Sequence, residues 1–354
     1  MQSPLTFNVL YTPGTAEPLR RFVPSWLRHT NALFRLVANG CARREVQMLK
    51  RLAASSDRLS FHRLPVREMI PHGEALSQLH ALHALHALDD LDDPEFFCFM
   101  DSDIFATGDF VAELSPHLEG RLAFCSASPI WALPSDQVSP AGVRFCGPHH
   151  QNENGLSLGS SYFAIYRNHE LRECMAETGV TFDKVTRVKR LKTPVQEILR
   201  RLDCVAAAYE AGKLINILLQ RDGGSIAFSE LGSLRHVGGL SLLAYRRHVG
   251  DGYVEIDDSG VTFQNDFKEE VRPWIPRKRL TCHYVSQQLA AMVRGETHGG
   301  DLLVTEPEVR ERVLDTVLRM RSLIDADRAW FERLDRRHWA SSAWGAWDAI
   351  RRRR

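Results

Sequence analysis

Two carboxylates stand one residue apart, directly after a short apolar run. The segment from Glu95 to Phe110 reads EFFCFMDSDIFATGDF, and Asp101 and Asp103 follow its most apolar part. Because a buried strand tolerates no unpaired charge, acids at its end are expected to meet a cation. Mg²⁺ and Mn²⁺ suit such oxygen ligands, and water and phosphate oxygens usually complete their shell. The pattern therefore predicts a Mn²⁺ or Mg²⁺ site that could hold a diphosphate, although a turn or helix-capping pair stays open as the alternative.

A histidine repeat offers a second metal hypothesis. LHALHALHAL places His80, His83 and His86 at every third position of an expected helix. A spacing of three drifts around a helix of 3.6 residues per turn, so only neighbouring pairs could share a ligand. We therefore expect three partly solvated histidines beside a leucine stripe rather than a metal site.

The first part of the chain alternates apolar strand patterns with helical patterns. Such alternation predicts a mostly parallel sheet with helices on both faces. Ligands of such sheets bind at the carboxyl ends of the strands. Asp101 and Asp103 lie at one such end. The expected strands are residues 7–12, 33–40, 59–65 and 95–101, and the expected helices are 20–30, 41–56 and 72–90.

The later chain predicts further strands, a long polar loop and a helical end. The loop covers residues 147–160, and a connection of that length is more often functional than idle. The expected strands are 121–128, 142–147, 160–167 and 225–231, and the expected helices are 193–202, 210–224 and one or two amphipathic helices from 307. We predict a domain over 1–250 with halves 1–110 and 111–250, a linker or surface excursion over 251–280, and a helical extension over 281–354.

Composition excludes several classes of protein. The 354 residues include 45 Lys and Arg against 44 Asp and Glu, so no global field recruits nucleic acid, and the four arginines from Arg351 are expected to form a solvated tail. The seven cysteines are scattered without a Cys-x-x-Cys spacing, which indicates a reducing, cytoplasmic environment. The sequence lacks a signal-peptide pattern and an apolar run long enough to span a membrane, so membrane contact is expected to be peripheral at most.

Five segments occur in an order that resembles a known family. They are FCFMDSDIFATGDF, PHGEAL (71–76), LGSSYFAIYRNH (158–169), YEAGKLINILLQRDG (209–223) and RHVGGLS (235–241). Together they resemble bacterial GT-A-type glycosyltransferases of the nucleotide-diphospho-sugar transferase superfamily, over about residues 5 to 245. The resemblance implies a Rossmann-type GT-A fold and transfer of a sugar from a nucleotide-diphosphate donor to a carbohydrate or other hydroxyl-bearing acceptor.

The resemblance also assigns residues. It implies that Asp101 and Asp103 bind the metal and the diphosphate, with Asp103 preferred as the direct metal ligand, and that His236 completes the metal shell. His236 has the alternative of an ordinary core or surface histidine. The residues expected to line the nucleotide-sugar are Thr12, Gly14, Asn39, His72, Gly73, Asp101 and Ser102, of which Gly14 and Gly73 also fit turn positions.

One departure from the family pattern concerns the general base. Glu210-Ala211-Gly212 stands where family members commonly carry Asp-Thr-Gly, so Glu210 is the first candidate base and Glu153, in the long loop, the second. Glu210 could instead only favour a helix N-terminus.

Two other functions stay open from the sequence. One is a phosphatase similar to the haloacid dehalogenases, which also carry Asp-x-Asp after an apolar strand, and the other is a non-catalytic nucleotide- or carbohydrate-binding module.

Overall fold

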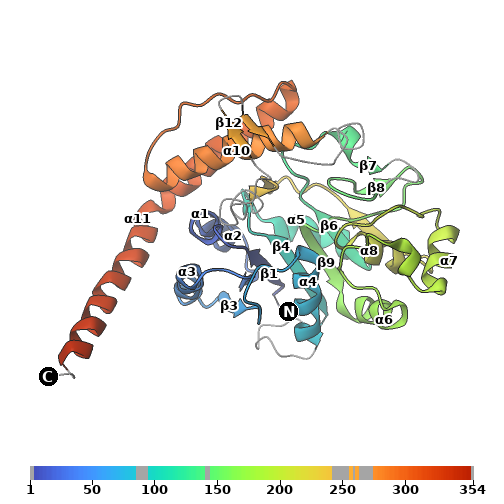
Figure 1. Ribbon diagram of the computed structural model, residues 1–354, viewed down its shortest axis with the longest axis horizontal. Helices are drawn as coiled ribbons and strands as arrows, with labels where there is room; N and C mark the ends of the chain where they lie inside the picture. The colour runs from blue at the N-terminus through green and yellow to red at the C-terminus, as the bar shows by residue number, and fades with distance from the viewer. Residues whose placement is uncertain are drawn as a thin grey trace.

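A computed structural model of the chain describes residues 4–84, 95–139, 144–240, 255–257, 260–262 and 274–351. Its centre is a seven-stranded sheet with helices packed on both faces (Figure 1). The strand order is β10-β6-β9-β4-β1-β2-β3, and only β9 runs antiparallel to its neighbours. The predicted mostly parallel α/β sheet is confirmed. The strands are β1 (Thr6–Tyr11), β2 (Leu33–Ala38), β3 (Leu59–Arg63), β4 (Phe96–Asp101), β6 (Ala123–Ser126), β9 (Phe163–Arg167) and β10 (Ile226–Phe228).

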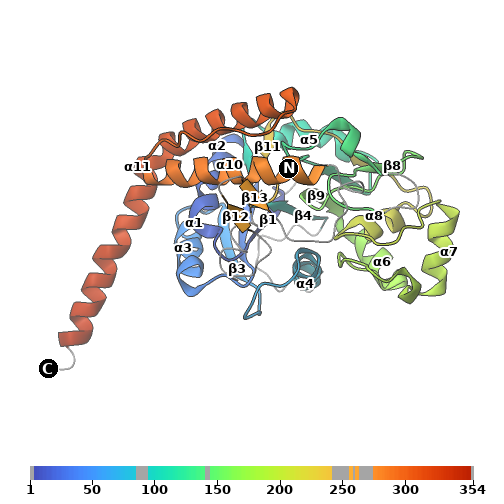
Figure 2. The same ribbon diagram turned by 45° about the horizontal axis from the view of Figure 1, so that its top comes forward.

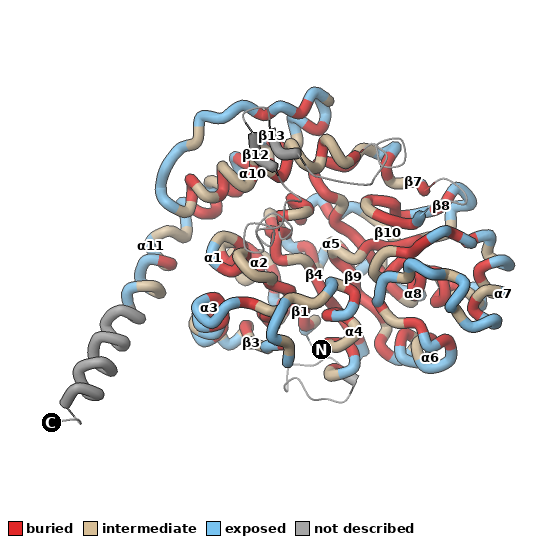
Figure 3. Tube along the Cα trace, in the orientation of Figure 1, coloured by how far each residue is buried: buried red, intermediate tan, exposed pale blue. Residues whose placement is uncertain are grey.

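The sheet separates two apolar cores because successive side chains of a strand point to opposite faces. On β4, Cys98 and Met100 belong to one core, whereas Phe97 and Phe99 belong to the other. Both faces of the strand are therefore buried, as the red strands of Figure 3 show, and this explains why its sequence is a continuous apolar run. Its first charged residue, Asp101, comes where the strand leaves the core.

Different helices cover the two faces. The first core includes side chains from α1 (Ala16–Leu19), η1 (Arg20–Phe22), α2 (Val23–His29), α3 (Arg43–Ala53), α5 (Phe110–Leu118), α10 (Trp274–Arg294) and α11 (Pro307–Arg351). The second includes side chains from α4 (His72–Ala84), α6 (Asn168–Thr178), α7 (Thr193–Arg201) and α8 (Lys213–Leu219). The remaining elements are β5 (Ile104–Ala106), η2 (Pro134–Asp136), β7 (Val138–Ser139), β8 (Gln151–Asn152), η3 (Val188–Arg190), β11 (Leu234–His236), β12 (Glu255–Asp257) and β13 (Gly260–Thr262).

The C-terminal helices pack against the beginning of the chain. Figure 2 shows α10 and α11 side by side across one face of the domain. The buried Arg20 guanidinium donates two hydrogen bonds, of 2.9 and 2.8 Å, to the carboxylate of Asp335. The predicted helical extension is therefore present, and it begins at Trp274, inside the range predicted as a linker. No helix in the described ranges is both long and apolar enough to cross a membrane.

Two local predictions are wrong. Of the strand expected over 142–147, residues 144–147 form only an isolated bridge at Phe145, whereas 142 and 143 lie outside the described residues. His80 and His83 are buried rather than partly solvated, because both rings pack edge-on against Phe97. Burial lowers the pKa of His80 to about 4. His86 lies outside the described residues.

Candidate metal and nucleotide-sugar site

The Asp-x-Asp pair and His236 meet at the carboxyl end of the central strand. Asp101 is the last residue of β4, and the chain turns at once into β5. Strand β5 pairs antiparallel with β11, which places His236 opposite Ile104. One ligand atom each from Asp101, Asp103 and His236 lies within 4.8 Å of the others. Residues more than 130 positions apart thus form a cluster of two carboxylates and an imidazole.

The imidazole of His236 is oriented for a ligand. Its Nδ1 lies 2.7 Å from the carbonyl oxygen of Ala127, to which it donates. Its Nε2 faces the acids, 3.3 Å from Asp103 Oδ1 and 3.8 Å from Asp101 Oδ2. This nitrogen is buried and makes no hydrogen bond with the described residues. A histidine whose Nδ1 donates to a carbonyl and whose Nε2 faces two carboxylates fits a metal ligand, so the donor set suits a divalent cation.

Asp103 is fixed by backbone amides that the sequence analysis did not identify. Its Oδ2 accepts hydrogen bonds of 3.0 Å from the amides of Gly239 and Leu240. Gly239 adopts φ +111°, and a Cβ there would lie 2.8 Å from Lys278 Cε. Only glycine suits this turn, and the Gly-Gly that follows His236-Val237 was the sequence signal. The amides leave Oδ1 directed at the cluster.

The three groups shift one another's pKa values in different directions. Burial, reinforced by the charge of Asp103, raises the pKa of Asp101 to about 6, against the opposing effect of His72. Burial also acts to raise the pKa of Asp103, but His236 and the two amides outweigh it and hold that pKa below its usual value. Burial acts to lower the pKa of His236, and the acids raise it above its usual value. Such opposed shifts in one buried cluster are typical of functional sites.

Helix α2 holds β5 in place from behind. Trp26 Nε1 donates a 2.9 Å hydrogen bond to the carbonyl of Ile104, and the Ala106 amide donates a 3.0 Å bond to Ser25 Oγ. Both side chains are fully buried. Because β5 carries the pairing with β11, these bonds indirectly set where His236 lies.

Three further side chains surround the cluster. His72, at the start of α4, lies 3.8 Å from Asp101 Oδ1 and hydrogen-bonds the carbonyl of Ser161 at 3.0 Å. The Tyr162 ring packs 4.8 Å from that of His236. Burial and the charges of Glu210 and Asp101 raise the pKa of Tyr162 well above its usual value. Glu210 Oε2 accepts a 2.7 Å bond from the Gly147 amide.

Several predicted nucleotide-lining residues have structural partners. Both ends of the Asn39 side-chain amide bond the backbone of Ile70, at 2.9 and 3.1 Å. Gly73 is required because a Cβ there would lie 2.3 Å from the Phe182 carbonyl oxygen. The Gly14 amide donates a 2.8 Å hydrogen bond to Glu45, a second anchor that the sequence analysis did not identify.

The other predicted residues have different environments. The Thr12 hydroxyl, at the carboxyl end of β1, is buried and lacks a partner among the described residues, so it remains available to a ligand. Ser102 is buried between the two acids of the Asp-x-Asp pair. Glu153 is exposed in the turn after β8. Of the two candidate bases, Glu210 is half-buried and its charge acts on Tyr162, which packs against His236, whereas Glu153 is exposed.

A buried lysine fixes the long loop over 147–160. Lys213 Nζ donates to the carbonyl oxygens of His149 and Gly159, the latter at 2.6 Å. Burial lowers the pKa of Lys213 to about 8, against the opposing charge of Glu210. In the sequence, Lys213 is only one residue of the helix expected over 210–224, and nothing there indicated that it is buried.

The shifted pKa of Lys213 predicts how stability changes with pH. The folded protein releases this proton near pH 8, whereas the unfolded chain keeps it until about 10.5. The unfolded state binds more protons in this window, so stability rises with pH there, by about 3 kcal/mol. Urea unfolding of the wild type and of Lys213→Met at pH 7.5 to 10.5 measures this. Over this range the free energy of unfolding of the wild type should rise relative to that of Lys213→Met, whereas a constant difference between the two would contradict the assignment. Cysteine ionisation affects both proteins equally, so it cancels in the difference.

Comparisons with known proteins give glycosyltransferase structures at low similarity. No protein-family model and no curated protein sequence matches the chain. Similar solved structures include the bifunctional glycosyltransferase WbbM (TM-score 0.35, 11% identity) and the glycosyltransferase GlyE of Streptococcus pneumoniae (0.33, 10%), each over 65% of this chain. The chain spans only 39% of the first and 46% of the second. The mannosyltransferase PcManGT of Pyrobaculum calidifontis, solved with GDP-Man and Mn²⁺, aligns over 93% of this chain and 88% of its own (0.36, 10%). At these scores the function has to be argued from the site itself.

Proposed function

We propose that the chain is a metal-dependent glycosyltransferase of the bacterial GT-A type, which moves a sugar from a nucleotide-diphosphate donor to an acceptor hydroxyl. The observation that carries the proposal is the buried Nε2 of His236, which makes no hydrogen bond with the described residues and faces two carboxylates where the central strand ends. A divalent cation among these three groups would offset the charge of the two buried carboxylates and bind the imidazole nitrogen. In parallel α/β sheets, the carboxyl ends of the strands are also where phosphate-bearing ligands bind.

Asp101, Asp103 and His236 would hold Mn²⁺ or Mg²⁺. When bound, the ion would neutralise the charge that develops on the departing nucleotide diphosphate. His72 lies 3.8 Å from Asp101, where its imidazole would border the phosphates of a bound donor. The buried Thr12 hydroxyl offers a further donor at the end of the neighbouring strand β1.

Glu210 is the proposed general base. The Gly147 amide holds one of its carboxylate oxygens, which leaves the other free to accept the proton of an acceptor hydroxyl. The charges of both Glu210 and Asp101 act on Tyr162, whose ring packs on that of His236, which supports a role for Glu210 at this end of the sheet. The seven cysteines, all buried and none in a disulfide, support the further proposal of a reducing, cytoplasmic location.

A thermal-shift experiment tests the proposal directly. A nucleoside diphosphate together with Mn²⁺ should raise the unfolding midpoint by about 5 °C at a hundredfold excess over its dissociation constant, because it binds only the native state. Either component alone should shift it much less. A panel of uridine, guanosine, adenosine and cytidine diphosphates with Mn²⁺ or Mg²⁺ covers the choice of base.

Three results would decide against a transferase. If no nucleoside diphosphate shifts the midpoint with either ion, the cluster does not hold a donor diphosphate. If the protein instead hydrolyses p-nitrophenyl phosphate and that activity is lost in Asp101→Asn, the phosphatase alternative is correct. Metal-dependent nucleotide binding without transfer to any acceptor, and without change in Glu210→Gln, would indicate a binding module.

A further inference from the structure

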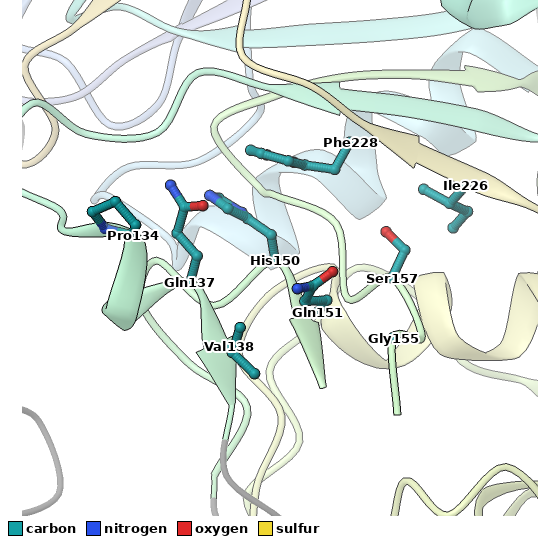
Figure 4. A pocket seen from close by; sticks show the side chains of 9 residues that line it. All are labelled: Pro134, Gln137, Val138, His150, Gln151, Gly155, Ser157, Ile226 and Phe228. Carbon is teal, nitrogen blue, oxygen red and sulfur yellow. The ribbon is translucent and has the colours of Figure 1, made fainter. Parts of the chain in front are cut away.

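A second, separate pocket lies at the edge of the sheet. It has a volume of about 250 Å³ and is formed by the segment after β6, the long loop and strand β10 (Figure 4). Its polar lining comes from Gln137, His150, Gln151 and Ser157, with Phe228 as an aromatic wall. None of its lining residues belongs to the Asp-x-Asp cluster. The pocket is therefore distinct from the Asp-x-Asp cluster.

Two polar atoms in this pocket lack partners. His150 Nδ1 and Ser157 Oγ are both buried and make no hydrogen bond with the described part of the chain. His150 is only 3% exposed, so its free nitrogen is not satisfied by bulk solvent. Buried groups of this kind are normally paired, so these two lining residues keep hydrogen-bonding capacity that the described protein atoms do not use.

The ring of His150 is held rigidly. Its Nε2 lies 2.5 Å from Ser128 Oγ, and its face stacks on Phe228 with centroids 3.5 Å apart and planes 17° from parallel. Gln137 also donates a 3.3 Å hydrogen bond to Ser128 Oγ. Figure 4 shows His150 between Gln137 and Phe228, on the side of the pocket facing Ser157. The free nitrogen is therefore fixed in position before any ligand binds.

The chemistry of the lining selects a neutral ligand rich in hydroxyl groups. Burial and the nearby charge of Lys213 lower the pKa of His150 well below its usual value, so the ring is uncharged at neutral pH. The other lining side chains carry amide, hydroxyl or apolar groups and no charge. A hydroxyl both donates and accepts, so it can pair with His150 Nδ1 in either tautomer and with Ser157 Oγ. Phosphates and carboxylates would find no cation here.

One dipeptide connects the pocket to the metal cluster. Ala127 accepts from His236 Nδ1, and the next residue, Ser128, hydrogen-bonds His150. The amide of Ser128 is in turn held by the carboxylate of Glu230, at 3.0 and 3.2 Å. The two histidine rings are therefore positioned by neighbouring residues at the end of β6, and the pocket shares the ligand-binding edge of the sheet with the cluster.

We propose that this pocket binds a neutral sugar ring of the acceptor, one other than the ring whose hydroxyl reacts. This inference rests on the transferase function proposed above. The volume is below the usual range for drug-sized ligands, so the pocket suits a single ring. Because the lining of the pocket shares no residue with the acid cluster, an acceptor that fills the pocket and also reaches the cluster is an oligosaccharide or glycan.

Binding of simple saccharides tests the pocket without knowledge of the acceptor. Methyl glycosides of glucose, galactose, mannose and N-acetylglucosamine are titrated into the full chain, in the presence of Mg²⁺ and the nucleoside diphosphate from the thermal-shift panel, with ligand-detected NMR. We expect at least one glycoside to bind with a millimolar dissociation constant. Ser157→Ala should weaken it about fivefold, as for the loss of one hydrogen bond.

Two tryptophan variants supply a matched pair. Gln151→Trp fills the pocket from an exposed lining position on β8 and should abolish glycoside binding. Asn154→Trp changes an exposed residue in the turn after β8, outside the lining, and should leave glycoside binding unchanged. Both should retain nucleoside diphosphate binding. If the nucleotide binds and none of the glycosides does, or if glycoside binding survives Gln151→Trp, the pocket inference is overturned. If the glycoside behaves as expected and no nucleotide binds, the pocket stands and the transferase proposal fails.

Discussion

Asp103→Asn is expected to lower the rate of sugar transfer at least a hundredfold and to abolish the metal-dependent thermal shift. The substitution removes a full charge from the acid nearest His236 Nε2, at 3.3 Å. Loss of one preorganised electrostatic partner commonly costs about 3 kcal/mol of transition-state stabilisation, a factor of 100 to 1,000. The asparagine oxygen can still accept from the amides of Gly239 and Leu240, so the turn after His236 should persist. Steady-state kinetics and thermal shift with Mn²⁺ measure the two effects.

Two further variants separate metal binding from proton transfer. Glu210→Gln should keep the metal-dependent shift but slow transfer by about 100- to 10,000-fold, because it removes only the proposed base. Asp222→Asn, which changes an exposed acid paired with Arg221, should alter neither quantity. Full activity in Asp103→Asn would mean that the cluster plays no part in catalysis.

The fold was predictable because its signals are local. The alternation of apolar strands with helical patterns predicts a mostly parallel sheet, and the continuous apolar run of β4 indicates burial on both faces. The missed elements are short or set by distant contacts. Strands β5 and β11 have three residues each and exist because they pair with each other. His80 and His83 were expected to be partly solvated because histidine is polar. In the fold, Phe97 of β4 packs against both rings, and Phe182 packs against that of His80.

The candidate site divides in the same way. Asp101 and Asp103 could be placed from the sequence because a strand end is a local feature. His236 could be suggested only by resemblance, because its position depends on a strand pairing with residues more than 130 positions earlier. Asn39 and Gly73 match the family pattern, but their observed contacts with Ile70 and Phe182 are ones that no spacing reveals.

Arg277→Met is expected to destabilise the protein by about 3 to 5 kcal/mol. Arg277, near the start of α10, is 8% exposed and donates to Asp136 Oδ2 at 2.5 Å and to Glu306 Oε1 at 3.3 Å. Asp136 is itself 5% exposed, so removal of the guanidinium leaves a carboxylate buried without its cation. Breaking one side of a buried pair costs this much because the remaining charge keeps its desolvation penalty. The free energy of unfolding in urea measures the loss.

The comparison variants identify burial as the cause. Arg294→Met breaks an ion pair whose side chains are 58% and 55% exposed, and should change stability by no more than about 0.5 kcal/mol. Adding Asp136→Asn to Arg277→Met should recover part of the loss, because the amide is neutral and its oxygen can still accept from the Leu133 amide. Equal effects of Arg277→Met and Arg294→Met, or additive losses in the double variant, would show that this pair does not fasten the C-terminal helices to the sheet domain.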